Sequence, residues 1–450
     1  MLRRLVLRFV FLGLVALVWS GASRAQAEFP LRNNDVWVMA GDSITAQHQH
    51  SNYFEAFCFA RYPNLKFAFR NSGVGGHTIP TTLARFDYDI AGWKPTVVSV
   101  ELGMNDQGGT PTDKFVANMQ TFVDRINAIK ARPVILSASP VNDGVLLSSK
   151  SGRNVRLNEY AIALKEVAAK NNIPYADQFH RLVDLWAVNK PYETLANTLP
   201  ALQSLAKDDK VAGVEHLRAF LTANEKQGAK YVSMQGDPVH PGPNGQLMMA
   251  AALLQELGAE AKVSSVTLDA EGKLVEATGC QVDGIKAEGD KLSFDRLDER
   301  LPFPIPDGTI DVLPMLPTIE ELSQYQLAVR GLKPGTYQVR IGNEPLNLTF
   351  TADDLAKGVN LTRAINAVAP NKNASNPLAN QGRGILTAVA QKAGLVGQWR
   401  SRSKQLHEAG AGAESRTDLA TLEQQILAAD EKIRETAKPQ KLHFELSRLP

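Results

Sequence analysis

Short apolar runs alternate with longer amphipathic stretches along the first half of the chain. Residues 36–40 form an apolar run rich in β-forming residues, which stops at Gly41, and an amphipathic stretch follows from about Ser51. Such runs are typical of buried strands, and the stretches between them have helical spacing. Alternating strands and helices predict a parallel sheet covered by helices on both faces, an α/β/α sandwich of three layers. The expected strands are residues 36–40, 65–69, 96–102, 133–137 and 172–176.

The pattern changes in the second half of the chain. From residue 261, short strand-like runs are separated by Glu-Gly and Gly-Asp turns, which predicts a small β-rich module over residues 261–352. Residues 353–450 return to helical spacing, and we expect a helical C-terminal region without chemistry of its own. Residues 180–235 carry leucines at helical spacing. This helical insertion would form either a wall or lid over a pocket, or peripheral packing.

The first 27 residues have the pattern of a signal peptide. Three arginines precede an apolar core at residues 9–19, and Ala25-Gln26-Ala27 has the small-x-small form of a cleavage site. The apolar core is shorter than the roughly 20 residues that a membrane-spanning helix needs. We therefore expect export and cleavage, a periplasmic or extracellular location, and no stable membrane span after cleavage. The first folded domain is then expected over residues 28–260.

Charge and cysteine content narrow the classes of partner. The chain has 49 Lys and Arg and 47 Asp and Glu, a net charge of +2, which becomes −2 without the four arginines of the leader. A near-neutral chain without a basic stripe gives no electrostatic reason to expect nucleic acid binding. Cys58 lies among phenylalanines, so a buried free thiol is favoured over a bridge to Cys280. The sequence indicates no particular oligomeric state.

Polar motifs follow three of the predicted strands. Gly41-Asp42-Ser43 follows the first strand, Asn71 to Thr78 forms a glycine-rich loop after the second, and Gly103-Met104-Asn105-Asp106 follows the third. A serine at a strand-to-helix junction has its hydroxyl at the rim of the sheet, beside free backbone N–H groups. Gly-Asp-Ser alone fits a tight turn equally well. Because the carboxyl ends of parallel strands meet at one edge, we expect Ser43, the glycine loop and Asn105 to lie together there.

A fourth motif lies late in the first domain, between residues 236 and 245. Asp237 and His240 are three residues apart on a turn that three prolines stiffen, ahead of an Ala-rich helical stretch. This spacing lets the carboxylate reach the imidazole of the same loop. Considered alone, the motif could equally be a helix-entry turn with a surface histidine.

Together, the four loops resemble the SGNH hydrolases, also called the GDSL family of esterases and lipases. The resemblance covers residues 35–258, in the order of the family, with isoleucine at position 44 where leucine is commonest. It implies a flavodoxin-like three-layer α/β/α sandwich with a parallel sheet, and neither metal nor other cofactor. The matching residues are Gly41-Asp42-Ser43-Ile44, Asn71-x-Gly73-x-x-Gly76-x-Thr78, Gly103-x-Asn105-Asp106 and Asp237-x-x-His240.

The resemblance also implies a role for each residue of the site. Ser43 would be the nucleophile and His240 its general base and later acid, with Asp237 orienting the imidazole. The backbone N–H groups of Ser43 and Gly76 and the side-chain amide of Asn105 would form the oxyanion hole. These residue types suit the chemistry, because a serine hydroxyl needs a neighbouring base, and histidine takes up and returns a proton near neutral pH. An uncharged amide donates to an oxyanion without forming an ion pair.

The expected function is an exported serine esterase that acts through an acyl-enzyme on a small-molecule or polysaccharide ester. The resemblance covers carbohydrate deacetylases, lysophospholipases, thioesterases and lipases. An accessory β-rich module favours deacetylation of a carbohydrate. The alternatives are a hydrolase of lipid acyl esters or thioesters, and a catalytically silent carbohydrate-binding or envelope protein. The chain lacks the Gly-x-Ser-x-Gly elbow of α/β-hydrolases, and its glycine loop lacks the Gly-x-Gly-x-x-Gly spacing of a dinucleotide site.

Several other residues of reactive type receive structural interpretations. His48 and His50 lie in the polar stretch Gln-His-Gln-His and are expected at a solvated helix entrance. His77 follows Gly76, and a substrate contact is the less favoured interpretation for it; Asp106 is expected to stabilise its own loop. Tryptophans 93 and 186 are expected in packing.

Overall fold

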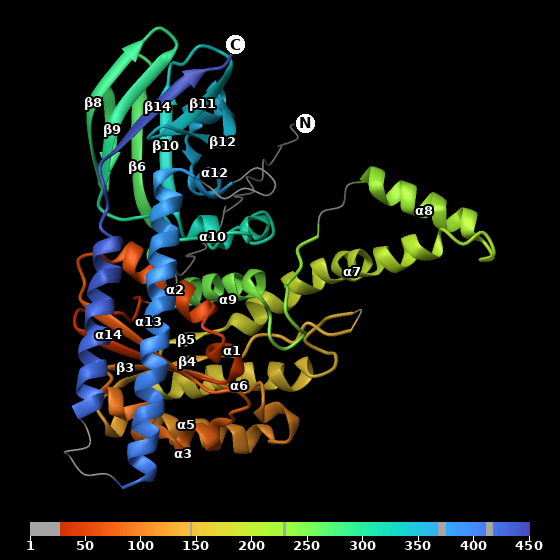
Figure 1. Cartoon of the computed structure of the whole chain (residues 1–450), viewed down its shortest axis with the longest axis vertical. Helices are drawn as coiled ribbons and strands as arrows, with labels where there is room; N and C mark the ends of the chain where they lie inside the picture. Colours follow the sequence, from red (N-terminus) through yellow and green to blue (C-terminus); the bar gives the residue numbers. More distant parts are fainter. Residues whose placement is uncertain (1–27, 145, 228–230, 368–374, 411–416) are drawn as a thin grey trace, which may run out of the picture.

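The computed structural model describes residues 28–144, 146–227, 231–367, 375–410 and 417–450, so the predicted signal peptide at 1–27 lies outside the described residues. The first domain is built on a five-stranded parallel sheet in the order β2-β1-β3-β4-β5 (Figure 1). This confirms the predicted parallel sheet. Its strands are β1 (Asp35–Gly41), β2 (Phe67–Gly73), β3 (Val97–Glu101), β4 (Arg132–Leu136) and β5 (Tyr175–Ala176).

Helices cover both faces of this sheet. Trp37 and Met39 of β1 belong to one hydrophobic cluster, while Val38 and Ala40 belong to a second, as the alternation of side chains along a strand requires. Helices α2, α7 and α9 lie on the first face, and α3 to α6 lie on the other (Figure 1). The predicted three layers are thus present. The elements are α1 (Ser43–Ala46), α2 (His50–Arg61), α3 (Ile79–Ala84), α4 (Phe86–Asp89), η1 (Ala91–Trp93), η2 (Asp106–Gly108), α5 (Thr112–Ala128), α6 (Asn154–Asn171), α7 (Gln178–Leu205) and α9 (Pro243–Glu256).

The expected insertion is helical and consists of most of α7 followed by α8 (Val214–Gln227). The buried residues of α7 all lie between Gln178 and Glu193. Figure 1 shows the remainder of α7 leaving the body of the domain, with α8 turning back above its outer half. The inner half of α7 therefore packs on the domain, and its outer half projects from it.

The second domain is a sandwich of two sheets, in the orders β13-β10-β6-β7 and β12-β11-β14-β9-β8. Arg296 of β9 crosses between them, donating to Ser264 of β6 and lying over the ring of Tyr325 of β10. The predicted β-rich module is therefore present. Its elements are β6 (Lys262–Asp269), β7 (Leu274–Thr278), β8 (Cys280–Glu288), β9 (Lys291–Asp298), η3 (Ile310–Val312), α10 (Thr318–Glu321), β10 (Gln324–Arg330), β11 (Thr336–Ile341), β12 (Glu344–Thr351), α11 (Ala352–Lys357), β13 (Val359–Asn360), α12 (Thr362–Asn366) and β14 (Leu442–Arg448).

The expectation of a purely helical region at 353–450 is wrong in two places. Strand β13 separates two short helices, and β14 lies inside the second sheet between β9 and β11. The apolar residues Leu442, Phe444 and Leu446 alternate with polar ones, which is the period of a half-buried strand. Its partners are distant in sequence, so the second sheet is complete only when the end of the chain returns to it.

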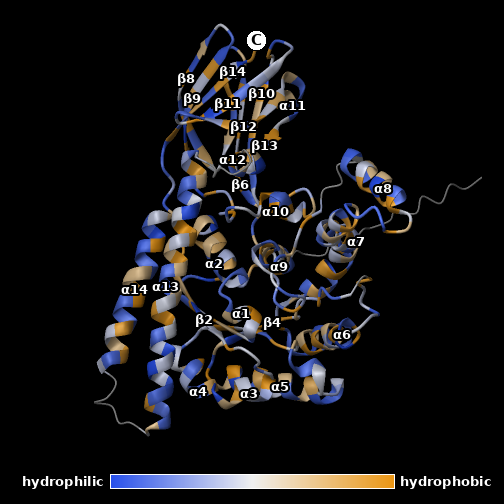
Figure 2. Ribbon diagram, turned by 45° about the vertical axis from the view of Figure 1, so that its right-hand side comes forward, coloured by the Kyte–Doolittle hydropathy of each residue, from blue (hydrophilic) through white to orange (hydrophobic). Residues whose placement is uncertain are grey.

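Between these strands, α13 (Pro377–Glu408) and α14 (Thr417–Thr436) form a helical hairpin. Figures 1 and 2 both show the hairpin alongside the first domain, reaching from its far end to the sandwich. Lys392 of α13 contacts the carboxylates of Glu55 and Asp430, and Asp430 also accepts from Arg70 of β2 at 2.8 Å. All four side chains are buried, so this hairpin is part of the core structure. No helix in the described ranges combines the length and hydropathy needed to cross a bilayer.

Residues that the sequence assigned to packing are buried as predicted. Trp93 stacks on Trp399 of α13, and Trp186 of α7 is almost fully buried. Both cysteines are free, and Cys58 is completely buried.

Candidate active site

Ser43 lies two residues after the end of β1 and is the first residue of the short helix α1. Asp42 caps this helix, accepting from the backbone N–H of Ile44 at 2.9 Å. A Cβ atom at Gly41 would lie 2.0 Å from the side-chain oxygen of Thr45, so only glycine lets the strand end pack this closely against the helix. The predicted strand-to-helix position of the serine is what the structure shows.

The loop of Asp237 and His240 brings both side chains to Ser43. His240 Nε2 lies 2.7 Å from Ser43 Oγ, and His240 Nδ1 lies 2.9 Å from Asp237 Oδ2. The other carboxylate oxygen of Asp237 accepts from the backbone N–H groups of Val239 and His240, each at 2.8 Å. The structure thus joins the three residues in one hydrogen-bonded chain, rather than leaving an isolated surface histidine.

This chain of hydrogen bonds is open to solvent. The side chain of Asp237 is 58% exposed, and that of His240 is 32% exposed. The N–H of His240, together with the hydrogen bond to its ring, lowers the pKa of Asp237, which is therefore ionised at neutral pH. An ionised Asp237 keeps the proton of the neutral imidazole on Nδ1. Nε2 is then free to accept from the serine hydroxyl.

The inner half of α7 holds the segment that leads into this loop. Asn189 donates to and accepts from the backbone of Val232, at 2.6 and 3.0 Å, and Glu193 accepts from the N–H of Met234 at 2.9 Å. Asn142 N–H donates to the carbonyl of Pro238 at 2.8 Å. Sequence reasoning left open whether the insertion packs at the periphery or forms a wall or lid. In the structure its buried half supports the histidine loop.

The glycine loop lies beside Ser43, as predicted. A Cβ atom at Gly75 would be 3.9 Å from that of Ser43, and one at Gly73 would be 2.5 Å from the backbone nitrogen of Ala46. Gly76 has φ +74°, in the left-handed region that favours glycine. The loop therefore needs glycine both for its close approach to the serine helix and for its own turn.

Asn105 contacts this same loop. Its side-chain amide donates to the carbonyl oxygen of His77 at 3.0 Å, next to Gly76. An amide nitrogen carries two hydrogens, so a second donor remains for a ligand. Asp106 reaches beyond its own loop, because it accepts from the N–H of Ile79 at the start of α3 at 3.2 Å. Burial raises the pKa of Asp106 to about 6.

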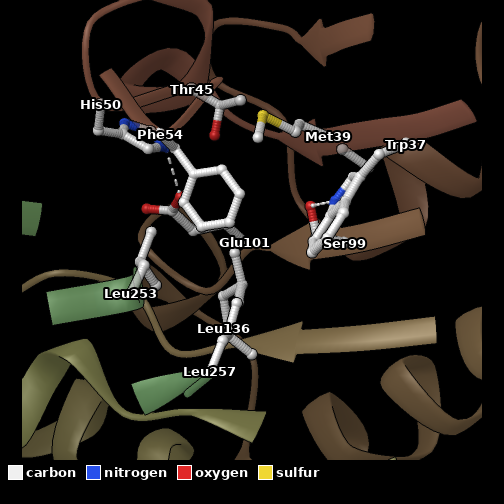
Figure 3. Close-up of a pocket in the computed structure, with 11 residues that line it drawn as sticks. Trp37, Met39, Thr45, His50, Phe54, Ser99, Glu101, Leu136, Leu253 and Leu257 are labelled. Carbon is white, nitrogen blue, oxygen red and sulfur yellow. Dashed lines mark hydrogen bonds and ion pairs between the residues drawn. The ribbon is translucent and has the colours of Figure 1, made fainter. Parts of the chain in front are cut away.

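The expectation that His50 is solvated is wrong. The ring is buried, with Nδ1 2.7 Å from the side-chain oxygen of Gln246. Its Nε2 lies 2.9 Å from Glu101 (Figure 3). Burial opposes the charged form, but the Glu101 carboxylate and the two hydrogen bonds outweigh it and raise the pKa of His50. His48 is also largely enclosed, and burial and the charge of Arg400 lower its pKa. Both histidines have polar neighbours in the sequence, so their burial was not predicted. Glu101, which ends an apolar strand, was a signal of a buried partner.

The cavity beside His50 is separate from the Ser43 hydroxyl. Figure 3 shows this cavity, with His50 and Glu101 on one side and the Trp37 and Ser99 pair on the other. Its lining includes neither Ser43 nor His240. Close to this polar cluster, burial raises the pKa of Asp42 to about 7. The turn that carries Ser43 therefore lies next to a cluster of buried polar residues, including His50 and Glu101, which sequence reasoning missed.

The first domain is similar in sequence to known proteins. Residues 39–248 match the model of the GDSL-like lipase/acylhydrolase family. An acetylxylan esterase of Geobacillus stearothermophilus is 23% identical over 209 residues, which cover 45% of this chain and 77% of that protein. A solved structure of an acetylxylan esterase from the same organism is 18% identical, covers 51% of this chain and 96% of that chain, and has a TM-score of 0.37.

A solved structure similar over most of the chain supports the whole architecture. The structure of a gut microbial diltiazem-metabolizing enzyme is 23% identical, covers 94% of this chain and 100% of that chain, and has a TM-score of 0.68. This likeness shows the fold, including the sandwich and the C-terminal helices. Residues 39–248 thus match the GDSL-like lipase/acylhydrolase family, and the enzyme class that this match supports is an acylhydrolase of the SGNH type.

Proposed function

We propose that the protein is an exported serine esterase that removes acetyl groups from a carbohydrate, with Ser43, His240 and Asp237 as its catalytic residues. The observation that carries the proposal is the continuous chain from Ser43 Oγ through His240 to Asp237, with steps of 2.7 and 2.9 Å. Both distances lie within the range in which a general base takes a proton.

The reaction proceeds in two acyl-transfer steps. Ser43 Oγ attacks the ester carbonyl while its proton moves to His240 Nε2, and the imidazolium then gives this proton to the departing alcohol oxygen. Water next attacks the acyl-enzyme, giving one proton to His240, which returns it to Ser43 Oγ as the acid is released. Asp237 remains ionised throughout and stabilises the imidazolium.

The oxyanion of each tetrahedral intermediate is held on the other side of Ser43. The backbone N–H groups of Ser43 and Gly76 and the second amide hydrogen of Asn105 are the proposed donors. Gly76 has no side chain, and a Cβ atom built there would have no neighbouring atom within 4 Å, so substrate can approach that backbone closely. Donors fixed by the fold need no reorganisation as charge develops on the oxygen.

Two observations favour an acetylated carbohydrate as substrate. The exposure of Asp237 and His240 leaves room for a large polar alcohol portion to stay in solvent. A relative of the hydrolase domain is named an acetylxylan esterase. Export, proposed from the pattern of residues 1–27, would bring the enzyme to extracytoplasmic polymers. Mass spectrometry of the protein from the producing cell tests this point, and a mature chain beginning at Glu28 is expected.

Hydrolysis of p-nitrophenyl acetate and octanoate, together with acetate release from acetylated xylan, tests the activity. We expect the acetate ester and the polysaccharide to be cleaved, and Ser43→Ala to abolish both activities without changing the melting temperature. Preference for octanoate would replace the carbohydrate proposal with a lipid acyl-ester hydrolase. Equal rates for the wild type and Ser43→Ala would refute the serine mechanism.

A further inference from the structure

A cation of the C-terminal hairpin lies behind the glycine loop of the active site. Arg400 of α13 donates from Nε and from one terminal nitrogen to the two oxygens of Asp89, at 2.6 and 2.8 Å. Its other terminal nitrogen donates to the carbonyl of Gly73 at 3.0 Å. The side chain of Arg400 is 16% exposed and that of Asp89 only 3%. All three arms of this guanidinium are thus bound within the fold.

The same aspartate binds a second arginine that reaches the other end of the loop. Arg85 pairs with Asp89, and its Nε donates to His77 Nδ1 at 3.2 Å. Burial, followed by the charge of Arg85, lowers the pKa of His77, in accord with a neutral ring that accepts this bond. The carbonyl of His77 is the atom that accepts from Asn105. One carboxylate therefore connects both ends of the segment 73–77, which we term the oxyanion loop.

The oxyanion loop is held by its own backbone at two points, where Val74 N–H donates to the carbonyl of Gly41 at 3.1 Å and His77 N–H donates to the carbonyl of Val74 at 3.3 Å. It contains three glycines, Gly76 has φ +74°, and neither Gly75 nor Gly76 has a side chain to pack. Glycine has the largest conformational freedom of any residue, so the direction of the Gly76 N–H depends on how the ends of the loop are held. Arg400 holds the first end and Arg85 the second. Two guanidinium groups on one carboxylate also leave a net positive charge behind the loop, which favours a developing oxyanion.

We infer that Arg400 is a positioning residue of the esterase, which fixes the oxyanion loop through Gly73 and Asp89. The C-terminal hairpin is then a part of the active-site structure rather than an appendage. This inference rests on the proposed function, because it concerns the oxyanion hole of that site. A small displacement of a transition-state donor lowers turnover far more than it weakens substrate binding.

The experiment compares two substitutions on one helix. Arg400→Gln removes the contacts to Gly73 and Asp89, and Arg402→Gln is the matched control, because Arg402 is 36% exposed and pairs with Asp418 of α14 rather than with a residue of the first domain. For each variant, kcat and KM are measured with p-nitrophenyl acetate. The inhibition constant of a phenylboronic acid, which forms a tetrahedral adduct with a catalytic serine, is measured in parallel.

We expect Arg400→Gln to lower kcat roughly 10- to 100-fold and to weaken boronate binding by a similar factor, with KM changed less than twofold. Arg402→Gln should change none of the three by more than twofold. Arg400→Lys is the second variant, in case Arg400→Gln does not fold. An ammonium group cannot bridge both oxygens of Asp89 and the Gly73 carbonyl, so its kcat should fall at least threefold at unchanged KM.

The outcomes separate this inference from the proposed function. Wild-type kcat and boronate affinity in a folded Arg400 variant would overturn the role of Arg400, while an inactive Ser43→Ala in the same assay would still support the serine mechanism. Activity in Ser43→Ala would instead remove the proposed function itself. Equal losses in Arg400→Gln and Arg402→Gln would also overturn the inference, since they would reflect general damage to the hairpin.

Discussion

The turnover of Asp237→Asn and Asp237→Ala should not follow the similarity of the new side chain to aspartate. Asparagine resembles aspartate more closely, yet we expect Asp237→Asn to be the slower enzyme. The reason is that Asp237 Oδ1 accepts from two backbone N–H groups, of Val239 and His240. In the asparagine variant the amide oxygen must stay at this position, because an NH₂ group there would face two donors. The NH₂ group is then directed at His240 Nδ1.

That geometry reverses the tautomer of the imidazole. Nδ1 must accept from the amide, so the ring proton moves to Nε2, which faces Ser43 Oγ at 2.7 Å and can no longer take its proton. Losing a hydrogen bond to a charged group costs about 1.5–3 kcal/mol, or roughly 10- to 150-fold in rate, and this applies to both variants. In the asparagine variant alone, the hydrogen bond from the side-chain amide to Nδ1 must also be broken to restore the productive tautomer. This costs about 0.5–1.5 kcal/mol more, or roughly 2- to 10-fold in rate.

The assay is kcat for p-nitrophenyl acetate at pH 8, together with the nitrogen-15 NMR signals of the His240 ring. Asp237→Ala should lose roughly 10- to 150-fold in kcat, because water can serve Nδ1, and Asp237→Asn should be about 2- to 10-fold slower again. The NMR signals should show the proton on Nε2 only in the asparagine variant. If Asp237→Asn is as fast as Asp237→Ala or faster, the assignment of Asp237 as the residue that sets the tautomer is wrong.

Three further changes test other parts of the structure. Asn105→Ala should lower kcat roughly 100- to 1000-fold with little change in KM, the usual effect of losing one oxyanion donor, and near-normal turnover would remove Asn105 from the hole. Asp42, whose folded pKa of about 7 lies above its ordinary 3.8, destabilises the fold progressively as pH rises from about 4 to 7. Asp42→Asn should therefore gain up to about 4 kcal/mol in unfolding free energy relative to wild type between pH 4 and pH 8 in urea denaturation; a constant difference would contradict the raised pKa. Lys392→Met, which leaves two buried carboxylates without their shared cation, should cost about 3–5 kcal/mol in the same measurement at neutral pH, whereas Lys432→Met on the exposed face of α14 should cost little, and equal effects would argue against a buried ion cluster.

The residues that meet at the candidate site could be predicted because each follows a strand of one parallel sheet. Ser43, the oxyanion loop and Asn105 lie after β1, β2 and β3, which are neighbours in the sheet, so their order in sequence implies their proximity. The histidine loop does not follow a strand. It could be placed only through the resemblance to a family, since a pairing over almost 200 residues has no local signal.

The buried partners could not be predicted for the same physical reason. His50 has polar neighbours, and its environment depends on Glu101 and on Gln246 of α9, which approach only after the sheet has formed. The sequence around Arg400 is typical of an ordinary charged helix, and the carboxylate that binds Arg400 is that of Asp89 in α4. Sequence periodicity identifies which face of an element is apolar, but it does not identify which charge a distant element will bury.

Burial of these charges indicates how the three parts of the chain depend on one another. The hairpin places Lys392 and Arg400 against the first domain, and the strand that follows it, β14, completes the sheet of the second domain between β9 and β11. Lys392 and Arg400 both have buried carboxylate partners in the first domain, and a buried charge without its partner is strongly unfavourable. These ion pairs therefore hold the hairpin against that domain. The hairpin that contacts the oxyanion loop through Arg400 is thus followed in the chain by a strand of the sandwich. Sequence reasoning treated the C-terminal helices as an addition to a hydrolase domain, whereas the buried ion pairs of Lys392 and Arg400 join them to that domain.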